Sequence, residues 1–334
     1  MATTADLSHA ARELLDRSFW SQVGLDMPMT AMLLEERRVT TKGGLQLWYH
    51  LGKDDAEDEA QDYLPGDILT VGQAEFINTA KFNWKYIQVP MRYGIDVHLQ
   101  NQLATSETKR RDLVSLLVER AEDGMKRRIE KRMHAVTAAG DTGAGLQGLP
   151  EAYDHSRTYG EITSNTTTVA YWNGASLADS YTDRATADPL SLDNLRKIKA
   201  IVKRYADKRD KLYVFLPEGL HSKLQGMCEG SAHYVAGTKE NSLLKYGFDA
   251  FHVYGMEVVC DSYMTLNSMT DDMLVVNPKY WHFRVHPDRN LKVNEFFHQA
   301  KVAGGKDEWI AHAYLCAAAI CFKPRTGMWK SALV

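Results

Sequence analysis

Three glycines have the spacing of a nucleotide-binding loop. Gly143, Gly145 and Gly148 match the GxGxxG pattern that holds the pyrophosphate of a dinucleotide. That pattern needs a strand before it and a helix after it, whereas this copy follows a long helix-forming stretch and runs into Leu149 and Pro150. We therefore expect a helix stop followed by a turn, with a nucleotide site as the disfavoured alternative.

Histidine and aspartate pairs are the other candidates for chemistry. His282 and His286 are four residues apart, but Phe283 between them favours a strand, on which that spacing separates the side chains by about 13 Å. Asp271 and Asp272 have no clustered partners and indicate a loop rather than a metal site. No metalloprotease, serine hydrolase, P-loop or kinase motif is present. We nominate no catalytic, cofactor-binding or metal-ligating residue, and we expect a protein that is not an enzyme.

Length, charge and cysteine content narrow the class of protein. The 334 residues suffice for two domains or for one large domain with insertions. A formal net charge of -3 excludes a globally basic nucleic-acid binder, so any contact with DNA would be local. No apolar run approaches the ~20 residues of a membrane span, and the first ten residues lack the pattern of a signal peptide. We expect a cytosolic protein whose four cysteines, Cys228, Cys260, Cys316 and Cys321, are buried free thiols.

A helix expected over residues 106–139 organises the rest of the chain. Its apolar residues follow an i+4 row that winds around the helix, which suits a rod lying obliquely across a sheet. Its C-terminal half has a basic excess, which forms either a solvated face or a surface for nucleic-acid backbone. Gly124 costs about 1 kcal/mol relative to alanine, so we expect a close packing contact there. The apolar residues are Leu113, Leu117, Ala121, Met125, Ile129, Met133 and Val136, and the basic ones are Lys126, Arg127, Arg128, Lys131 and Arg132.

Two strands with alternating patterns precede this helix. Residues 39–51 and 76–89 alternate between apolar and polar side chains, with Phe82 and Trp84 on one face of the second strand. The segment between them is acidic and cannot contribute to a core, so it is either a surface loop or an extension that contacts a partner. Its acidic residues are Asp54, Asp55, Glu57, Asp58, Glu59 and Asp62.

The second half of the sequence predicts an α/β lobe and a long final strand. A helix over residues 191–205 and short strands such as 212–216 and 256–260 alternate in the middle of the chain. Residues 309–322 are rich in alanine, yet larger side chains occupy every second position, which predicts a strand with one small-residue face. A long helix such as the one at 106–139 would fit against that face.

This order of elements resembles the major capsid proteins of tailed bacteriophages, which have the Hong Kong 97-type fold. Three stretches after the long helix carry the similarity, namely GLQGLPEAY at 145–153, TYGEI at 158–162 and YWN at 171–173. A fourth, VVCDSYM at 258–264, resembles the strand and turn of the central lobe in that family.

The resemblance implies an α+β fold built around the long helix, which is the spine helix of that family. It implies an N-terminal arm at 1–35, an extended β-hairpin loop at 36–90, a peripheral domain at 91–150 and 275–334, and an inserted α/β axial domain at 151–274. It also implies hexamers and pentamers that form an icosahedral shell around double-stranded DNA, in a virion assembled in the cytoplasm of a bacterial host. No membrane is involved, and scaffolding, portal and decoration proteins are further partners of such shells.

The resemblance also assigns roles to charged and aromatic residues. The hairpin extension would contact a neighbouring subunit, and the basic residues of the spine helix would face the lumen and bind DNA without specificity. Two alternatives stay open: an encapsulin-type shell that encloses cargo enzymes, and a soluble α/β enzyme with a glycine-rich nucleotide loop. The extension residues are Asp54, Asp55, Glu57, Asp58, Glu59, Phe82 and Trp84, and the lumen-facing residues are Lys126, Arg127, Arg128, Lys131 and Arg132.

Overall fold

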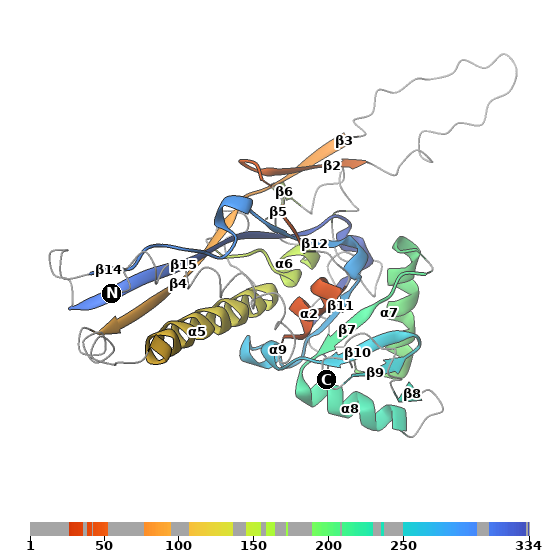
Figure 1. Cartoon of the computed structure of the whole chain (residues 1–334). Helices are drawn as coiled ribbons and strands as arrows, with labels where there is room; N and C mark the ends of the chain where they lie inside the picture. Colours follow the sequence, from red (N-terminus) through yellow and green to blue (C-terminus); the bar gives the residue numbers. More distant parts are fainter. Residues whose placement is uncertain are drawn as a thin grey trace, which may run out of the picture.

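The computed structural model has two six-stranded β-sheets joined along one long helix (Figure 1). It describes residues 27–35, 39–41, 43–52, 77–94, 107–135, 145–154, 158–163, 172, 189–207, 209–229, 235–236, 250–298, 307–331 and 333. The acidic segment of the predicted extension, with Asp54, Asp55, Glu57, Asp58 and Glu59, lies outside these residues. In the part of the chain that the structure describes, no helix is long and apolar enough to cross a membrane.

The first sheet is organised around β15 (Glu308–Cys321). Its strand order is β1 (Val39–Thr41), β12 (Trp281–Val285), β15 and β13 (Lys292–Val293), and β4 (Lys85–Gly94) and β14 (Phe297–His298) also pair with β15. β4 runs antiparallel to β15 along its whole length, from Gly94 opposite Glu308 to Lys85 opposite Ala317. The strand predicted at 309–322 is therefore confirmed.

The small-residue face of β15 belongs to the core of the molecule. Ala311 and Ala313 are fully buried, whereas His312 and Tyr314 on the opposite face are half-buried. Small side chains on the inner face let the neighbouring layer approach closely, which explains an alanine-rich strand in a sequence that helix propensity alone would assign to a helix.

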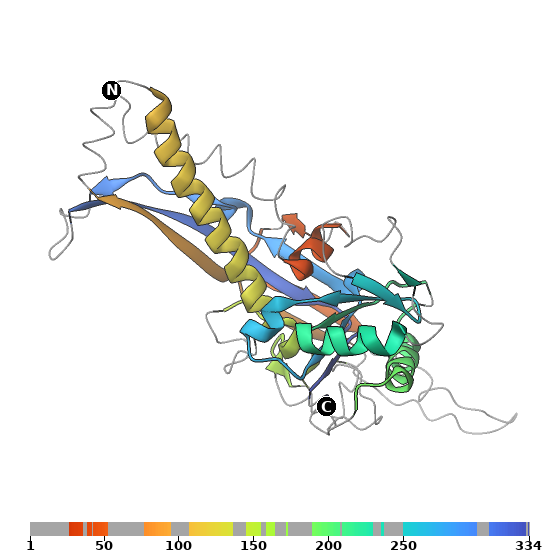
Figure 2. The ribbon, with the colours of Figure 1, turned by 90° about the horizontal axis from the view of Figure 1, so that it is seen from below.

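Helix α5 (Glu107–His134) crosses the first sheet obliquely and packs chiefly on β4 (Figure 2). Its inner side is lined by Val118, Ala121, Met125, Ile129 and Met133, all buried. These positions are three or four residues apart and so lie on one side of the helix. The long helix predicted at 106–139 is confirmed over Glu107–His134, and it ends earlier than predicted because Ala135 is not helical.

The contact at Gly124 is less close than we expected. A Cβ at this position would lie 3.7 Å from Cγ1 of Val89 on β4, which is an ordinary van der Waals distance. The packing therefore does not require a glycine here.

The second sheet forms an α/β lobe. Its strand order is β16 (Met328–Lys330), β11 (Met273–Val276), β7 (Tyr213–Leu216), β10 (Met256–Cys260), β9 (Ala250–Val253) and β8 (Val235–Ala236). Helices α7 (Leu192–Tyr205) and α8 (Glu218–Glu229) pack on one face, where Val214 and Leu216 point. Tyr213 and Phe215 point the other way, into the core shared with α5. Burial of both faces explains the continuous apolar run in β7.

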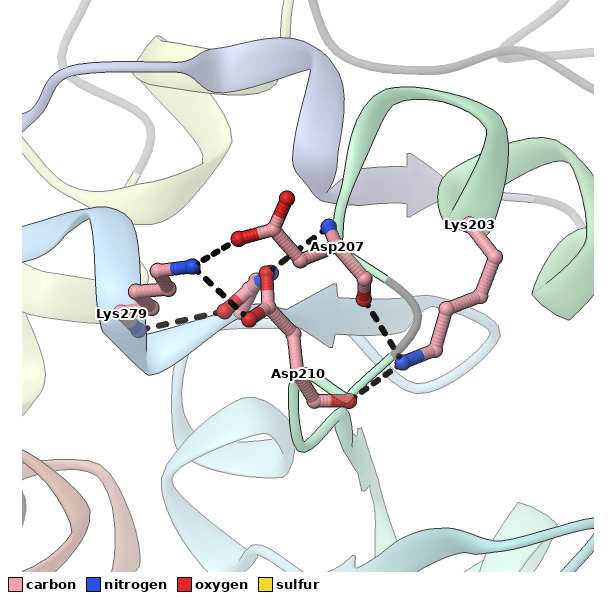
Figure 3. Close-up of polar contacts among 5 residues, drawn as sticks. Lys203, Asp207, Asp210 and Lys279 are labelled. Atoms are coloured by element: carbon pink, nitrogen blue, oxygen red, sulfur yellow. Dashed lines mark hydrogen bonds and ion pairs between the residues drawn. The ribbon is translucent and has the colours of Figure 1, made fainter.

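An ionic cluster braces the crossover between the two sheets (Figure 3). The chain leaves β11 through Asn277 and enters β12 after Lys279. The Lys279 ammonium contacts Asp207 and, at 3.1 Å, Asp210, and the Asn277 side chain donates to Asp210 at 3.0 Å. Lys203 on α7 donates to the carbonyl oxygens of Asp207 and Asp210. The end of α7 is thereby tied to the crossover.

The strands before the spine helix differ from the prediction. Residues 39–51 contain β1 in the first sheet and most of β2 (Leu47–Gly52), which among the described residues pairs with β3 (Ile77–Phe82) in a separate two-stranded ribbon. Residues 76–89 divide into β3 and β4 because the alternation changes phase where Trp84 and Lys85 are both buried. The ribbon projects from the body of the protein (Figure 1).

Two further elements were not predicted. Helix α2 (Pro28–Glu35) lies in the segment for which only an arm was expected, although Pro28 at its first position and the mostly apolar stretch from Met29 to Leu33 favour a helix. Strand β16 pairs with β11 in the α/β lobe, whereas residues 275–334 were expected to lie with the spine helix. The short elements that complete the chain are α6 (Leu149–Tyr153), β5 (Thr158–Tyr159), β6 (Ile162–Thr163), α9 (Ser262–Leu266), η4 (Pro278–Tyr280), η5 (Pro287–Arg289) and η7 (Pro324–Thr326).

Candidate assembly surfaces

Aromatic side chains attach the base of the ribbon to the first sheet. The Phe82 ring on β3 meets the Tyr159 ring edge-to-face at 5.1 Å, and Tyr49 on β2 meets Phe322 at 4.4 Å. The Tyr159 hydroxyl accepts a hydrogen bond from the Cys321 backbone N–H at 2.8 Å. Two aromatic contacts and a buried hydrogen bond therefore fix the direction in which the ribbon leaves the body.

The TYGEI stretch forms the hairpin of β5 and β6 that supports this base. Gly160 and Glu161 both have positive φ, at 60° and 64°, as a tight hairpin turn requires. The Gly160 carbonyl oxygen accepts from the Lys81 N–H at 3.0 Å. A Cβ at Gly160 would lie 2.8 Å from Cζ of Phe82, so only glycine fits. The stretch that resembles capsid proteins thus has a local structural role.

The prediction that Phe82 and Trp84 contact a neighbouring subunit is wrong for both side chains. Phe82 is 1% exposed and Trp84 is 8% exposed. The Trp84 indole N–H donates to the Gly44 carbonyl oxygen at 2.8 Å, and its ring meets the His286 ring at 5.1 Å. Both aromatics fill the core of their own chain, Phe82 against Tyr159 and Trp84 against His286.

Other apolar residues at the base of the ribbon are exposed. Leu45 is 95% exposed and Trp48 is 57% exposed. The Lys81 ammonium lies 5.5 Å from the Trp48 ring centroid, and Gln46 accepts from the Trp48 indole N–H at 3.2 Å. An oriented, exposed tryptophan beside an exposed leucine is the composition of a protein interface.

The basic residues predicted to face a lumen divide into an exposed and a buried group. Arg127, Arg128 and Lys131 are exposed, and Arg127 pairs with Asp123 at 3.0 Å. Lys126 is 6% exposed and lies 3.8 Å from Glu122, which is also buried.

Burial lowers the Lys126 pKa, while Glu122 acts in the opposite direction. Arg132 is half-buried, and its guanidinium would lie 2.9 Å from a Cβ at Gly145. Lys126 is therefore not part of an exposed face. The lumen-facing role of the other residues stays a prediction.

The glycine-rich loop after the spine helix is closed by packing. A Cβ at Gly148 would lie 2.5 Å from the Met133 carbonyl oxygen, so this glycine lets the loop fold back on the end of α5. The helix that follows, α6, has five residues, all buried, and Tyr153 in it accepts a hydrogen bond from the Trp281 indole at 2.8 Å. Gly143 lies outside the described residues. The described part of the loop packs closely and does not open toward a ligand.

Three ionisable side chains meet in the interior beside this loop. Glu130 and His134 lie one turn apart on α5, and Asp261 precedes α9 in the α/β lobe. All three side chains are fully buried. His134 Nε2 is 2.7 Å from Asp261 Oδ2, and His134 Nδ1 donates to the Glu130 carbonyl oxygen at 2.9 Å. The Glu130 carboxylate accepts from the backbone N–H groups of Met29 and Thr30, at 2.9 and 3.0 Å, and from the Thr30 hydroxyl.

The surroundings shift the pKa values of this cluster. Burial raises the pKa of Glu130 to about 7, against the opposing effect of His134. Burial alone would lower the pKa of His134, but the Asp261 carboxylate and Glu130 raise it to about 9. The cluster therefore keeps the imidazole charged at neutral pH.

A metal ion does not fit the cluster, although one ligand atom from each residue lies within 4.8 Å of the others. The 2.7 Å separation of His134 Nε2 and Asp261 Oδ2 is that of a charge-assisted hydrogen bond. Both Glu130 oxygens already accept hydrogen bonds from the start of α2. His134 and Asp261 form an ion pair, and Glu130 is occupied by α2, so the three side chains do not converge on an ion.

The other residues considered for chemistry in the sequence take part in packing and hydrogen bonds within the fold. His282 packs edge-to-face on Phe322 at 4.6 Å, and Asp272 accepts from the Trp329 indole at 3.2 Å. Of the cysteines, Cys228, Cys316 and Cys321 are buried free thiols, and Cys260 is half-buried.

Solved structures of shell proteins share this architecture. A chain of the capsid asymmetric unit of cyanophage A-1(L) matches with a TM-score of 0.63 and 16% identity, over 93% of each chain. The capsid of an empty GTA particle matches with a TM-score of 0.55 and 10% identity, over 91% of this chain and 90% of that one. The SrpI encapsulin of Synechococcus elongatus PCC 7942 matches with a TM-score of 0.52 and 10% identity, over 90% and 87%. No protein-family model matches the sequence, and no curated protein does.

The fold is thus a mixed α+β fold, and it is the fold of phage major capsid proteins. The resemblance recognised in the order of elements is confirmed at the level of the fold. Because the sequence identities are only 10 to 16%, these matches show a common fold and nothing more specific.

Proposed function

We propose that this protein is the major capsid protein of a tailed double-stranded DNA bacteriophage and that it assembles into an icosahedral shell of hexamers and pentamers. The observation that carries the proposal is the match to the cyanophage capsid chain across 93% of both chains. A match of this extent compares most of the chain and is not confined to one of its parts. The protein then has a structural role and no catalytic one.

The parts of the chain have corresponding roles in this proposal. Residues 1–35 are the N-terminal arm, 36–90 the extended loop, 91–150 and 275–334 the peripheral domain, and 151–274 the axial domain. The arrangement is of the Hong Kong 97 type. β16 extends the axial sheet and is the exception to these boundaries.

The ribbon supplies one contact between subunits. Its base is fixed by Phe82 and Tyr49, so its direction is set before assembly. Trp48 and Leu45 are exposed there and would become buried against a neighbouring subunit. The acidic residues at positions 54–59 would then meet basic side chains of that neighbour. Many modest contacts of this kind suit a closed symmetric shell.

The exposed basic side of α5 supplies the contact with DNA. Arg127, Arg128 and Lys131 would attract phosphate groups without reading bases. Since Arg127 is paired with Asp123, the attraction is weak and salt-sensitive. A packaged genome could therefore leave the shell.

Assembly and content of the particle test the proposal. Size-exclusion chromatography and negative-stain electron microscopy of the purified chain should give capsomers or shells, and deletion of residues 54–61 should prevent shells while leaving folded subunits. A small oligomer from the intact chain, or normal shells from the deletion, would contradict it. An enzyme with a nucleotide loop predicts the small oligomer.

An encapsulin-type shell is the second candidate, favoured by the match to the SrpI encapsulin. The fold is common to both classes, so the content of the particle distinguishes them. Particles purified from the natural host should contain nuclease-protected DNA if the protein is a phage capsid protein. A protein cargo without DNA would support the encapsulin class instead.

A further inference from the structure

The buried cluster of Glu130, His134 and Asp261 joins three separate parts of the chain. Glu130 holds the first residues of α2, the N-terminal helix. His134 is on the spine helix, and Asp261 caps α9 of the α/β lobe by accepting from the Tyr263 N–H at 2.9 Å. These hydrogen bonds connect segments that are more than 100 residues apart in sequence. Any movement of α2 or of the lobe relative to α5 must change the cluster.

The hydrogen bonds determine where the protons are. The Glu130 carbonyl oxygen can only accept, so His134 Nδ1 carries a proton. An ionised Asp261 can also only accept, so Nε2 carries a second proton, and the imidazole is charged. With Glu130 ionised, the cluster contains two negative charges and one positive charge, and a single additional proton makes it neutral.

A net charge in a fully buried site is unfavourable. The positive, N-terminal end of the α2 helix dipole offsets about half a unit of the excess negative charge, because the Met29 and Thr30 N–H groups point at Glu130. Neutral Glu130 can keep these contacts. The Thr30 hydroxyl, now a donor to Glu130, can rotate to accept the new O–H.

We propose that Glu130, His134 and Asp261 form a proton-operated latch, closed when Glu130 is protonated and loosened when Glu130 ionises, that holds α2 and the α/β lobe on the spine helix. The latch makes attachment of the N-terminal helix depend on pH in the neutral range. It is a conformational device in the subunit and does not depend on whether the shell encloses DNA or protein.

The direction of the effect follows from proton linkage. Burial raises the pKa of Glu130 from 4.5 to about 7, so the attached state binds a proton more tightly than the detached state. The stabilisation is fully present below pH 4.5 and is lost as pH rises through 7. Among the described residues, the groups that act on Glu130 are His134, Asp261, Thr30 and Met29. The charged imidazole of His134 opposes the rise in the Glu130 pKa without reversing it.

Hydrogen–deuterium exchange of the full-length protein tests the latch. Exchange of the Met29 and Thr30 amides and of the amides within α2 is measured from pH 5 to 8 at constant ionic strength, and each rate is corrected for the intrinsic pH dependence of exchange. One linked proton reduces protection by up to about tenfold per pH unit between pH 5 and 7, followed by a plateau. Helix α8, which has no residue in the cluster, is the internal control and should show no such slope.

Two variants separate a latch from an ordinary buried hydrogen bond. Glu130→Gln has nearly the same shape and cannot ionise, so protection of α2 should lose its pH dependence between pH 5 and 7. Glu122→Gln is the matched control, because Glu122 is a buried carboxylate two turns earlier on α5, paired with Lys126. In the Glu122→Gln protein, protection of α2 should depend on pH as it does in the wild-type protein.

Three results would overturn the proposal. The first is protection of α2 in the wild-type protein that is flat between pH 5 and 7. The second is a Glu130→Gln protein that retains the wild-type slope with uniformly lower protection, as expected of a hydrogen bond with only a structural role. The third is protection of α8 that depends on pH as strongly as protection of α2 does. The wild-type comparison of α2 with α8 decides the matter even if Glu130→Gln does not fold.

Discussion

Replacement of Gly124 by alanine should stabilise the protein. Gly124 lies in the interior of α5, where glycine costs about 1 kcal/mol relative to alanine. The new methyl group would lie 3.7 and 3.8 Å from the two methyl carbons of Val89, so it fits without displacing β4. Partial burial of that methyl group contributes a few tenths of a kcal/mol, on the order of half of a fully buried methylene.

The expected gain is therefore about 1 kcal/mol, which raises the melting temperature by about 2 °C in a chain of this size. Urea denaturation of unassembled subunits, followed by tryptophan fluorescence, measures the change in the free energy of unfolding. The midpoint should rise while the slope of the free energy against urea concentration stays unchanged.

Gly148→Ala is the matched control with the opposite sign. Its methyl carbon would lie 2.5 Å from the Met133 carbonyl oxygen and 2.7 Å from that of Arg132. Backbone atoms cannot move aside cheaply, so we expect a loss on the order of 3 kcal/mol. A destabilised Gly124→Ala protein, or an unaffected Gly148→Ala protein, would refute the reasoning about local space.

Three further predictions concern the core, the buried cluster and the ribbon. Tyr153→Phe removes the acceptor of the Trp281 indole N–H, and it should lower the free energy of unfolding in urea by about 1 to 3 kcal/mol. His134 has a pKa raised from 6.5 to about 9, so its stabilisation is fully present below pH 6.5 and is lost as pH rises through 9. His134→Gln should therefore flatten the fall in melting temperature between pH 7 and 9, and scanning calorimetry of both proteins would show an unchanged fall if the imidazole is not involved. Trp48→Ala should leave the melting temperature of subunits within 1 °C or so of wild type, since an exposed side chain contributes little, while reducing shell yield in electron microscopy; full yield would exclude Trp48 from the interface.

Regular local patterns allowed much of the fold to be predicted. The alternation in residues 309–322 identified β15 against its helix propensity, and Ser191 marked the start of α7, where its hydroxyl accepts from the Asn194 N–H at 3.2 Å. The strand predicted at 256–260 is β10, and Gly255, with a φ of 74°, is in the turn that joins it to β9. In each case the residues that determine the structure are close together in sequence.

Features that depend on distant residues were missed. Lys126 was counted with the exposed basic residues of the spine helix, although it is buried, as are Glu122 and Glu130 on the same helix. Pairing with one another, or with the start of α2, allows charged groups to be buried, and a helical pattern does not reveal such partners. A signal was present for Glu130, because it follows Ile129 and precedes Met133 on the apolar side of the helix.

The buried cluster could not be assembled from the sequence for the same reason. His134 is one of twelve histidines in the sequence, and Asp261 was part of a stretch noted only for its resemblance to capsid proteins. They are 2.7 Å apart in the structure and 127 positions apart in the sequence. Likewise, the resemblance alone assigned Phe82 and Trp84 to a subunit contact, and their partners in the core, Tyr159 and His286, are distant in the sequence.

The pairing of β4 with β15 has a consequence for synthesis of the chain. β4 ends at Gly94 and its partner begins at Glu308, so the ribosome must translate most of the protein before these strands can meet. The α/β lobe, in contrast, has all of its strands except β16 within residues 213–276. During that interval β4 has an unpaired edge, which is a hazard for aggregation in a protein made at high concentration. β15, the strand that completes the first sheet, therefore leaves the ribosome late, and nascent chains depend on rapid synthesis of residues 308–321 to avoid pairing with one another.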